Sequence, residues 1–176
     1  MRIITLFFIA LCLISCTNKN TSPNTLQTVQ AYIPVYLQTS SVNTIAVEAV
    51  RPTTNAGKIY AWGNYIFQVE ENEGIHIIDN SSSVNAKKIA FLKVPLCGEI
   101  SIKGNYLYTN NYKDLVVFDI STINSPILVK RLASVFPAIN QNYPPYSNCY
   151  FQCADTTKGI VVKWVLQSVE QPNCMR

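Results

Sequence analysis

Charged residues are scarce in this chain of 176 residues, at 14% against the roughly 25% of an ordinary soluble domain. Fourteen basic residues against ten acidic ones give a formal net charge of +4. That excess is too small to indicate a basic surface for nucleic acid, so we expect no nucleic-acid partner. A hydrophobic content of 48% excludes a largely disordered chain.

Histidine occurs once, as His76, which excludes sites built from several histidines and leaves little room for histidine catalysis. The sequence also lacks a glycine-rich phosphate loop, a Gly-x-Ser-x-Gly elbow and a His-Glu-x-x-His zinc motif. Because no set of residues supports a reaction, we predict that the protein is not an enzyme. We expect no cofactor and no metal ion.

The N-terminus reads as a secretion signal. Arg2 precedes an apolar run over 3–14, which is too short to cross a bilayer as a helix. The ending Leu-Ile-Ser-Cys resembles a bacterial lipobox, which implies cleavage after residue 15 and lipidation of Cys16. The alternatives are an ordinary cleaved signal or a short buried strand. Several acyl chains at Cys16 would form a stable membrane anchor.

Residues 16–30 begin with a polar stretch without apolar periodicity, which predicts a flexible tether. Residue 17 is not the aspartate associated with retention in the inner membrane, so we expect an outer-membrane lipoprotein. The tether carries Lys19 and no acidic residue of the kind that directs lipoproteins to the cell surface. The periplasmic face is therefore slightly favoured over the cell surface.

The central part of the chain contains an internal repeat. Residues 62–67 align with 103–108 at an offset of 41, and 74–81 align with 114–121 at an offset of 40. Each unit predicts four short strands, and Gly-Asn between the first two strands is a hairpin signal. The expected strands are 58–62, 65–69, 75–78 and 88–94 in the first repeat (58–97), and 99–103, 106–110, 115–118 and 128–132 in the second (98–132). Four strands in about 40 residues is the blade period of a β-propeller, so we predict an all-β fold.

The stretch Leu-Val-Val-Phe-Asp-Ile-Ser at 115–121 resembles the LVIVD repeat, and Ile-His-Ile-Ile-Asp-Asn-Ser at 75–81 is a looser copy. Residues 31–36 and 158–162 are similar to segments of Bacteroidetes lipoproteins that carry these repeats. The resemblance implies a propeller-like, membrane-anchored protein without assigned catalytic residues.

Two repeats are too few to close a propeller ring, since propellers use four to eight blades. Three explanations stay open: a truncated propeller, association of the open edges with other copies, or capping by the flanking segments. In the last case 31–57 forms an N-terminal cap and 133–176 forms a loop-rich C-terminal cap.

Acidic residues and the histidine are candidate chemical groups in the repeats. Asp79 and Asp119 end equivalent strands, where we expect them to accept hydrogen bonds in the next turn. His76 is predicted to be a structural residue of a buried strand. Glu70, Glu71 and Glu73 are expected on an exposed turn, although paired carboxylates can act as acid and base.

Four cysteines remain after removal of the signal segment and lipidation of Cys16. An exported compartment permits disulfides, and their connectivity is open. Free thiols and a zinc site are the alternatives. The candidate bridging residues are Cys97, Cys149, Cys153 and Cys174.

Residues 140–151 are rich in tyrosine, proline and asparagine. Tyr143, Tyr146 and Tyr150 could stack on a sugar or a partner, because tyrosine has a flat apolar face and a polar tip. The structural alternative is a rigid connector. We predict a non-enzymatic binding or scaffold module of the cell envelope, with a membrane contact through its anchor and an envelope protein or a glycan as partner. The alternative is a carbohydrate-binding accessory protein or a degenerate glycan enzyme.

Overall fold

The computed structural model describes residues 28–176 except 83 and 138–140. The predicted signal segment 1–15, Cys16 and most of the tether lie outside the described residues. The described chain consists of β-strands and two short 3-10 turns, as the sequence predicts for an all-β fold. Within it, no helix has the length and apolar character needed to cross a membrane.

The first repeat forms a five-stranded antiparallel sheet. Its four predicted strands are β3 (Ala56–Trp62), β4 (Tyr65–Glu70), β5 (Gly74–Asp79) and β6 (Lys87–Lys93), and β2 (Ala46–Glu48) adds a fifth strand beside β6. Gly63 has a φ of +56° in the turn between β3 and β4, a conformation that glycine adopts without strain. The predicted Gly-Asn hairpin is therefore confirmed.

The second repeat forms a four-stranded sheet with the same connectivity. Its strands are β7 (Ile100–Lys103), β8 (Tyr106–Asn111), β9 (Asp114–Asp119) and β10 (Ile127–Leu132), in the order β10-β9-β8-β7. Gly104 takes the place of Gly63, with a φ of +58°. Both repeats also carry a register shift at the same place in their last strand pair. The repeat in the sequence is thus a repeat in the backbone.

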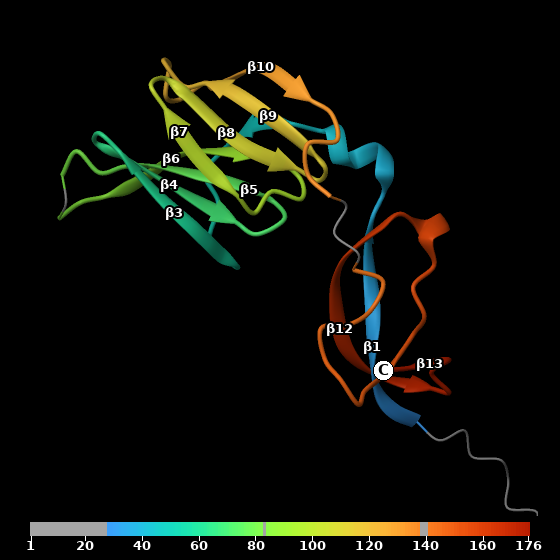
Figure 1. Ribbon diagram of the computed structural model, residues 1–176. Helices are drawn as coiled ribbons and strands as arrows, with labels where there is room; N and C mark the ends of the chain where they lie inside the picture. The colour runs from blue at the N-terminus through green and yellow to red at the C-terminus, as the bar shows by residue number, and fades with distance from the viewer. Residues whose placement is uncertain (1–27, 83, 138–140) are drawn as a thin grey trace, which may run out of the picture.

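The two repeat sheets pack face to face around one hydrophobic core (Figure 1). Phe67, Val69, Ile75, Ile77 and Leu92 come from the first sheet; Ile102, Leu107, Val116 and Phe118 come from the second. Neither sheet closes into a barrel or a ring. The predicted partial, propeller-like arrangement of two repeats agrees with this architecture.

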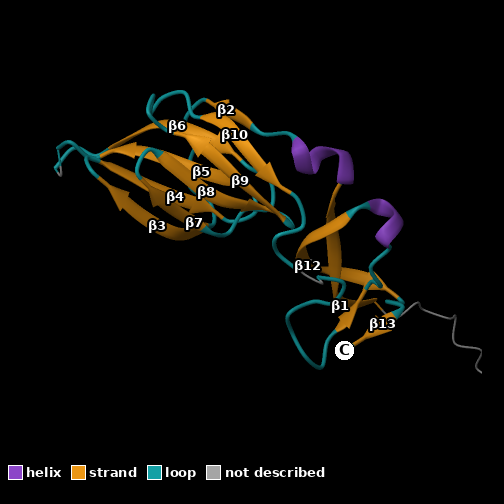
Figure 2. Cartoon of the chain, turned by 45° about the horizontal axis from the view of Figure 1, so that its top comes forward, coloured by secondary structure: helices purple, strands orange, loops and turns teal. Residues whose placement is uncertain are grey.

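A third sheet joins the segments that flank the repeats. Its order is β12 (Ile160–Glu170), β1 (Thr28–Leu37), β11 (Tyr150–Phe151) and β13 (Cys174–Met175). We call it the terminal sheet. β1 and β12 pair antiparallel from Thr28↔Glu170 to Leu37↔Ile160. Figure 2 shows this sheet beside the repeat pair, with the 3-10 turn η1 (Thr39–Asn43) between them.

The outer face of the first repeat, which points away from the second repeat, is covered by the loop 49–55. The Arg51 guanidinium lies 4.6 Å from the centre of the Phe91 ring, and Lys88 Nζ donates to the Arg51 carbonyl at 2.8 Å. Phe91 has no exposed surface. One face of the repeat pair is thus closed by the chain's own polar segment, while β2 from the same region extends the sheet.

Candidate functional site

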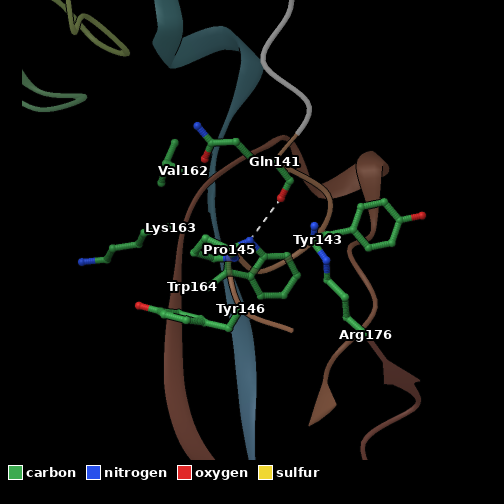
Figure 3. A pocket seen from close by; sticks show the side chains of 8 residues that line it. All are labelled: Gln141, Tyr143, Pro145, Tyr146, Val162, Lys163, Trp164 and Arg176. Atoms are coloured by element: carbon green, nitrogen blue, oxygen red, sulfur yellow. Dashed lines mark hydrogen bonds between the residues drawn. The ribbon is translucent and has the colours of Figure 1, made fainter. Parts of the chain in front are cut away.

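A pocket of about 460 Å³ lies on the terminal sheet, where the loop before β11 crosses β12 (Figure 3). We call it the aromatic pocket. Its lining comes from the predicted tyrosine loop, from β12 and from the residue after β13. The lining residues are Gln141, Tyr143, Pro145, Tyr146, Val162, Lys163, Trp164 and Arg176.

The aromatic side chains of the pocket are held in place by other rings. Tyr146 stacks on Tyr32 of β1, with centroids 4.7 Å apart and an interplanar angle of 18°. Trp164 packs edge-to-face against the buried Phe151 at 5.6 Å, and its Nε1 donates to the Gln141 carbonyl at 3.1 Å. Burial raises the pKa of Tyr32, and the neighbouring Tyr146 and Cys149 add to this effect. These contacts fix the orientation of the rings before any ligand binds.

The three tyrosines predicted from the sequence separate in the structure. Tyr143 and Tyr146 line the pocket and are about half exposed, at 58% and 52%. Tyr150 does not line it, because the residue lies in β11, where it pairs with Ala31 and Met175. Trp164, Lys163 and Arg176 join the pocket although sequence reasoning did not select them. Trp164 lies in a long strand distant in sequence, and only the pairing of β1 with β12 explains its position.

The charged side chains of the pocket are both cationic. The Arg176 guanidinium lies 5.9 Å from the centre of the Tyr143 ring and also donates to the Pro144 carbonyl. In Figure 3 the Arg176 side chain reaches up between Trp164 and Tyr143, whereas Lys163 points away from the rings. No aspartate or glutamate is among the lining residues. Neither Arg176 nor Lys163 forms an ion pair within the part of the chain that the structure describes.

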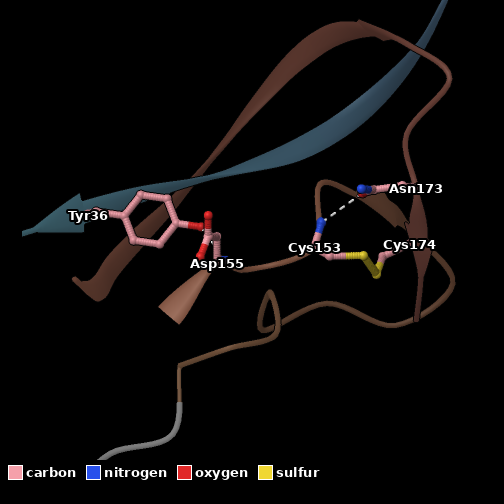
Figure 4. The surroundings of a disulfide bond; sticks show 5 residues. All are labelled: Tyr36, Cys153, Asp155, Asn173 and Cys174. Atoms are coloured by element: carbon pink, nitrogen blue, oxygen red, sulfur yellow. Dashed lines mark hydrogen bonds between the residues drawn. A yellow bond between two sulfur atoms is a disulfide. The ribbon is translucent and has the colours of Figure 1, made fainter. Parts of the chain in front are cut away.

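A disulfide between Cys153 and Cys174 fastens the terminal sheet beside this pocket (Figure 4). It joins the chain just after β11 to β13, and the Cys153 amide also donates to Asn173 Oδ1 at 2.9 Å. The Asp155 amide donates to the Tyr36 hydroxyl at 2.7 Å, which ties the same segment to β1. The bridge therefore fixes β13, the strand that directly precedes Arg176.

The other two candidate cysteines, Cys97 and Cys149, are free thiols, which is the alternative that the sequence leaves open for them. Cys97 is buried between the repeat sheets, where its Sγ contacts the Gly74 carbonyl at 3.4 Å. Burial raises the pKa of Cys97 to about 12, so its thiol stays protonated. Cys149 is half-buried, and its Sγ lies 3.2 Å from the Tyr146 carbonyl. The two lie in different parts of the fold, which prevents them from pairing with each other.

Glu70 and His76 form a fully buried pair in the first repeat, which corrects the expectation that Glu70 lies on an exposed turn. His76 Nε2 lies 2.9 Å from Glu70 Oε2, and both side chains have no exposed surface. Glu70 Oε1 accepts from the Thr54 hydroxyl at 2.6 Å and from the amides of Thr54 and Asn55. Successive side chains of a strand point to opposite faces of the sheet. Because Val69 points into the core, Glu70, which follows it at the end of β4, points to the outer face and lies under the loop 49–55.

The pKa of both members of this pair is lowered, but for different reasons. Burial alone would raise the pKa of Glu70, but the hydrogen bonds from Thr54, His76 and Asn55 outweigh it and lower the pKa to about 2. Burial lowers the pKa of His76, although the bond to Glu70 opposes that shift. A neutral His76 thus donates its Nε2–H to a Glu70 carboxylate, and Nδ1 has no partner among the described residues. Through its hydrogen bonds to Thr54 and Asn55, the pair holds the loop 49–55 against the outer face of the first repeat.

Asp79 and Asp119 have the turn role that the sequence predicts. Asp79 Oδ1 accepts from the Ser81 amide at 2.9 Å, and Asp119 Oδ1 accepts from the Ser121 amide at 2.8 Å. These hydrogen bonds lower the pKa of both carboxyl groups. In the described parts of the chain, no group of three His, Cys, Asp or Glu side chains has the geometry of a metal site.

A second, larger cleft of about 720 Å³ lies between the first repeat and the terminal sheet. Its walls mix apolar residues of β1 and β12 with charged residues of both signs. Three of these charged residues are already in ion pairs: Arg51 pairs with Glu73, and Lys93 pairs with Glu48 outside the lining. The aromatic pocket, with its preformed rings and unpaired cation, is the better candidate for a ligand.

Comparison with known protein families finds one matching repeat in this chain. Residues 97–133 match the LVIVD repeat. This segment coincides with the sheet β7–β10 and its flanking turns. No curated protein and no solved structure matches the chain. The match therefore supports a repeat-containing β-structure, and it covers neither the terminal sheet nor the aromatic pocket.

Proposed function

We propose that the protein is a lipid-anchored, non-enzymatic binding module of the cell envelope whose ligand site is the aromatic pocket. The single observation that carries this proposal is the set of preorganised rings that line the pocket, the half-exposed Tyr143 and Tyr146 and the partly buried Trp164. Rings already fixed by Tyr32 and Phe151 lose little conformational entropy when a ligand binds.

The pocket could bind either an envelope protein or a carbohydrate, and one observation favours the carbohydrate. Flat rings with a polar rim stack well on the apolar face of a sugar, and the pocket presents three such rings within one small depression. A protein interface of standard size covers about 800 Å² of surface on each partner, which is a broad area rather than a small depression. A single pocket of about 460 Å³ is better suited to a few sugar units.

The binding proposal is tested on a glycan array with the full chain. Tyr143→Ala combined with Tyr146→Ala should abolish binding, while Tyr106→Ala, which removes a similarly exposed tyrosine from the LVIVD repeat, should leave it intact. Binding that survives the double substitution would reject the aromatic pocket as the site. Capture of a single envelope protein in place of any glycan would favour the scaffold role.

The anchor is tested separately. The pattern of residues 1–16 supports lipidation of Cys16 and residence in the outer membrane, on the periplasmic face. Mass spectrometry of the N-terminal peptide should find a diacylglyceryl group, and Cys16→Ser should release the protein from the membrane fraction. Cys149→Ser is the matched control and should stay in that fraction. If protease added to intact cells digests the protein, then the protein lies on the cell surface and the periplasmic assignment is wrong.

A further inference from the structure

We propose that the aromatic pocket selects an acidic saccharide, one whose sugar units carry a carboxylate, through stacking on Tyr146 and Trp164 and a salt bridge to Arg176. This inference rests on the proposed carbohydrate-binding function and names the class of sugar.

The first step is the geometry of the rings. Tyr32 covers one face of Tyr146 at 4.7 Å, so the other face of Tyr146 is free for a ligand. Phe151 holds the Trp164 ring edge-on, and the Nε1–H of Trp164 is occupied by the Gln141 carbonyl. The indole therefore offers a flat surface and no hydrogen-bond donor. Such rings bind the apolar face of a sugar but do not distinguish a neutral sugar from an acidic one.

The second step is the charge at the rim. Arg176 lies between Trp164 and Tyr143 in Figure 3, and within the described residues its guanidinium donates one hydrogen bond, to the Pro144 carbonyl. The remaining guanidinium N–H groups are free to bind two oxygens of a carboxylate side by side. No aspartate or glutamate side chain lines the pocket, and the Arg176 guanidinium forms no ion pair among the described residues.

The third step is the fixed position of Arg176. The amide and carbonyl of Arg176 both hydrogen-bond to Cys149 at 3.0 Å, and the disulfide holds Cys174 two residues away. The guanidinium also lies over the Tyr143 ring. A cation held by backbone pairing, a disulfide and a ring contact is oriented before the ligand arrives, which favours a specific salt bridge over diffuse attraction.

The test measures binding of the full chain, purified in detergent, by titration calorimetry. The probes are a short oligogalacturonate, its fully methyl-esterified form, dextran and dextran sulfate. We expect the oligogalacturonate to bind at least about tenfold more tightly than its ester. Arg176→Gln should remove that preference. Lys130→Gln deletes the same charge from an exposed position of the LVIVD repeat and should preserve it.

Arg176→Lys guards against a loss of pocket shape, since it keeps the charge and loses the forked geometry. It should bind the acidic probe more weakly than the unchanged protein and more tightly than Arg176→Gln. Equal affinity for the acid and its ester would overturn the inference and leave the carbohydrate-binding proposal intact. Preference for dextran sulfate over oligogalacturonate would also overturn it. Failure to bind any saccharide would reject both the inference and the carbohydrate function.

Discussion

The buried Glu70–His76 pair is expected to contribute measurably to stability. Glu70→Gln leaves a side chain that cannot accept every hydrogen bond from Thr54, Asn55 and His76. A buried polar group that loses a partner costs about 1–3 kcal/mol, so the variant should be less stable by that amount in urea unfolding. Glu99→Gln breaks only an exposed ion pair with Lys58 and should change stability by less than about 1 kcal/mol. Equal losses in the two variants would contradict the buried role.

The same pair predicts a dependence of stability on pH. The pKa of Glu70 is about 2 in the fold and 4.5 in the unfolded chain, so its contribution is complete above about pH 4.5 and lost as the pH falls towards 2. His76 also has a lowered pKa, so its contribution begins to fall once the pH drops below 6.5. The melting temperature should therefore decrease on acidification from pH 7 to pH 2. In Glu70→Gln the decrease between pH 4.5 and 2 should be shallower; an unchanged slope would contradict the prediction.

The buried state of Glu70 could not be predicted from the sequence. Three glutamates within four residues indicate a solvated turn, and the position at the end of β4 places only the first of them under the loop 49–55. That loop has no periodic signal, so nothing in the sequence announces that it covers the sheet. His76 was easier, because the apolar run around it predicts a strand buried on both faces.

At the level of elements, the eight strands of the two repeats were predictable because the hairpin signals and the repeat period agree. The third sheet was not, because β1 and β12 are separated by more than a hundred residues and local patterns carry no information about such pairing. The aromatic pocket depends on this sheet. Its tyrosines could thus be found in the sequence, while Trp164 and Arg176 could not.

The disulfide should stabilise the terminal sheet in particular. Cys153 and Cys174 are separated by 21 residues, and a bridge over such a loop contributes about 3 kcal/mol by restricting the unfolded chain. Replacing both with alanine should increase hydrogen exchange in β11–β13 and leave β4–β9 protected. Cys149→Ala is the control and should change neither region. Faster exchange in the repeats would contradict this division.

The outer face of the LVIVD repeat, which points away from the core, carries lysines at positions where the first repeat carries residues that pack in the core. The strand pairing and the repeat offsets show which positions of the two repeats are equivalent. Lys103, Tyr108 and Lys130 of the second repeat are equivalent to Trp62, Phe67 and Ala90 of the first. In the first repeat this face contacts the core, and Phe67 and Ala90 are buried. In the second it faces away from the core, and two of the equivalent positions hold exposed lysines. Buried lysine ammonium groups would oppose the packing of a further blade.

This face yields a prediction about association. Lys103→Trp with Lys130→Ala restores the pattern of the first repeat and adds apolar surface beside Leu115 and Val117. The double variant should self-associate in sedimentation velocity at concentrations where the unchanged protein is monomeric. Lys103→Gln with Lys130→Gln removes the same two charges without the apolar area and should stay monomeric. Association of the glutamine variant would assign the effect to charge alone.

At the scale of the whole molecule, the repeats and the terminal sheet have separate internal supports. The large hydrophobic cluster draws its buried residues from the repeats alone, whereas the terminal sheet depends on the β1–β12 pairing, on Phe151 and Trp164, and on the disulfide. Hydrogen bonds that connect the parts include Asn111 Nδ2 to the Val42 carbonyl and the Phe136 amide to the Lys113 carbonyl, at 2.9 Å each. These are few compared with the bonds within each part.

The protein should therefore unfold in two steps. For residues 16–176 with Cys16→Ser, we expect a monomer by mass and two calorimetric transitions, because a boundary with few buried apolar contacts transmits little cooperativity. A reductant should lower the transition of the terminal sheet, monitored by Trp164 fluorescence in a Trp62→Phe background, and leave the repeat transition in place. A single transition that shifts as a whole would mean that the cleft between the parts contributes more than its polar lining suggests. A discrete oligomer would mean that the open sheet edges pair between chains, and non-cooperative melting would identify the repeats as part of a longer propeller.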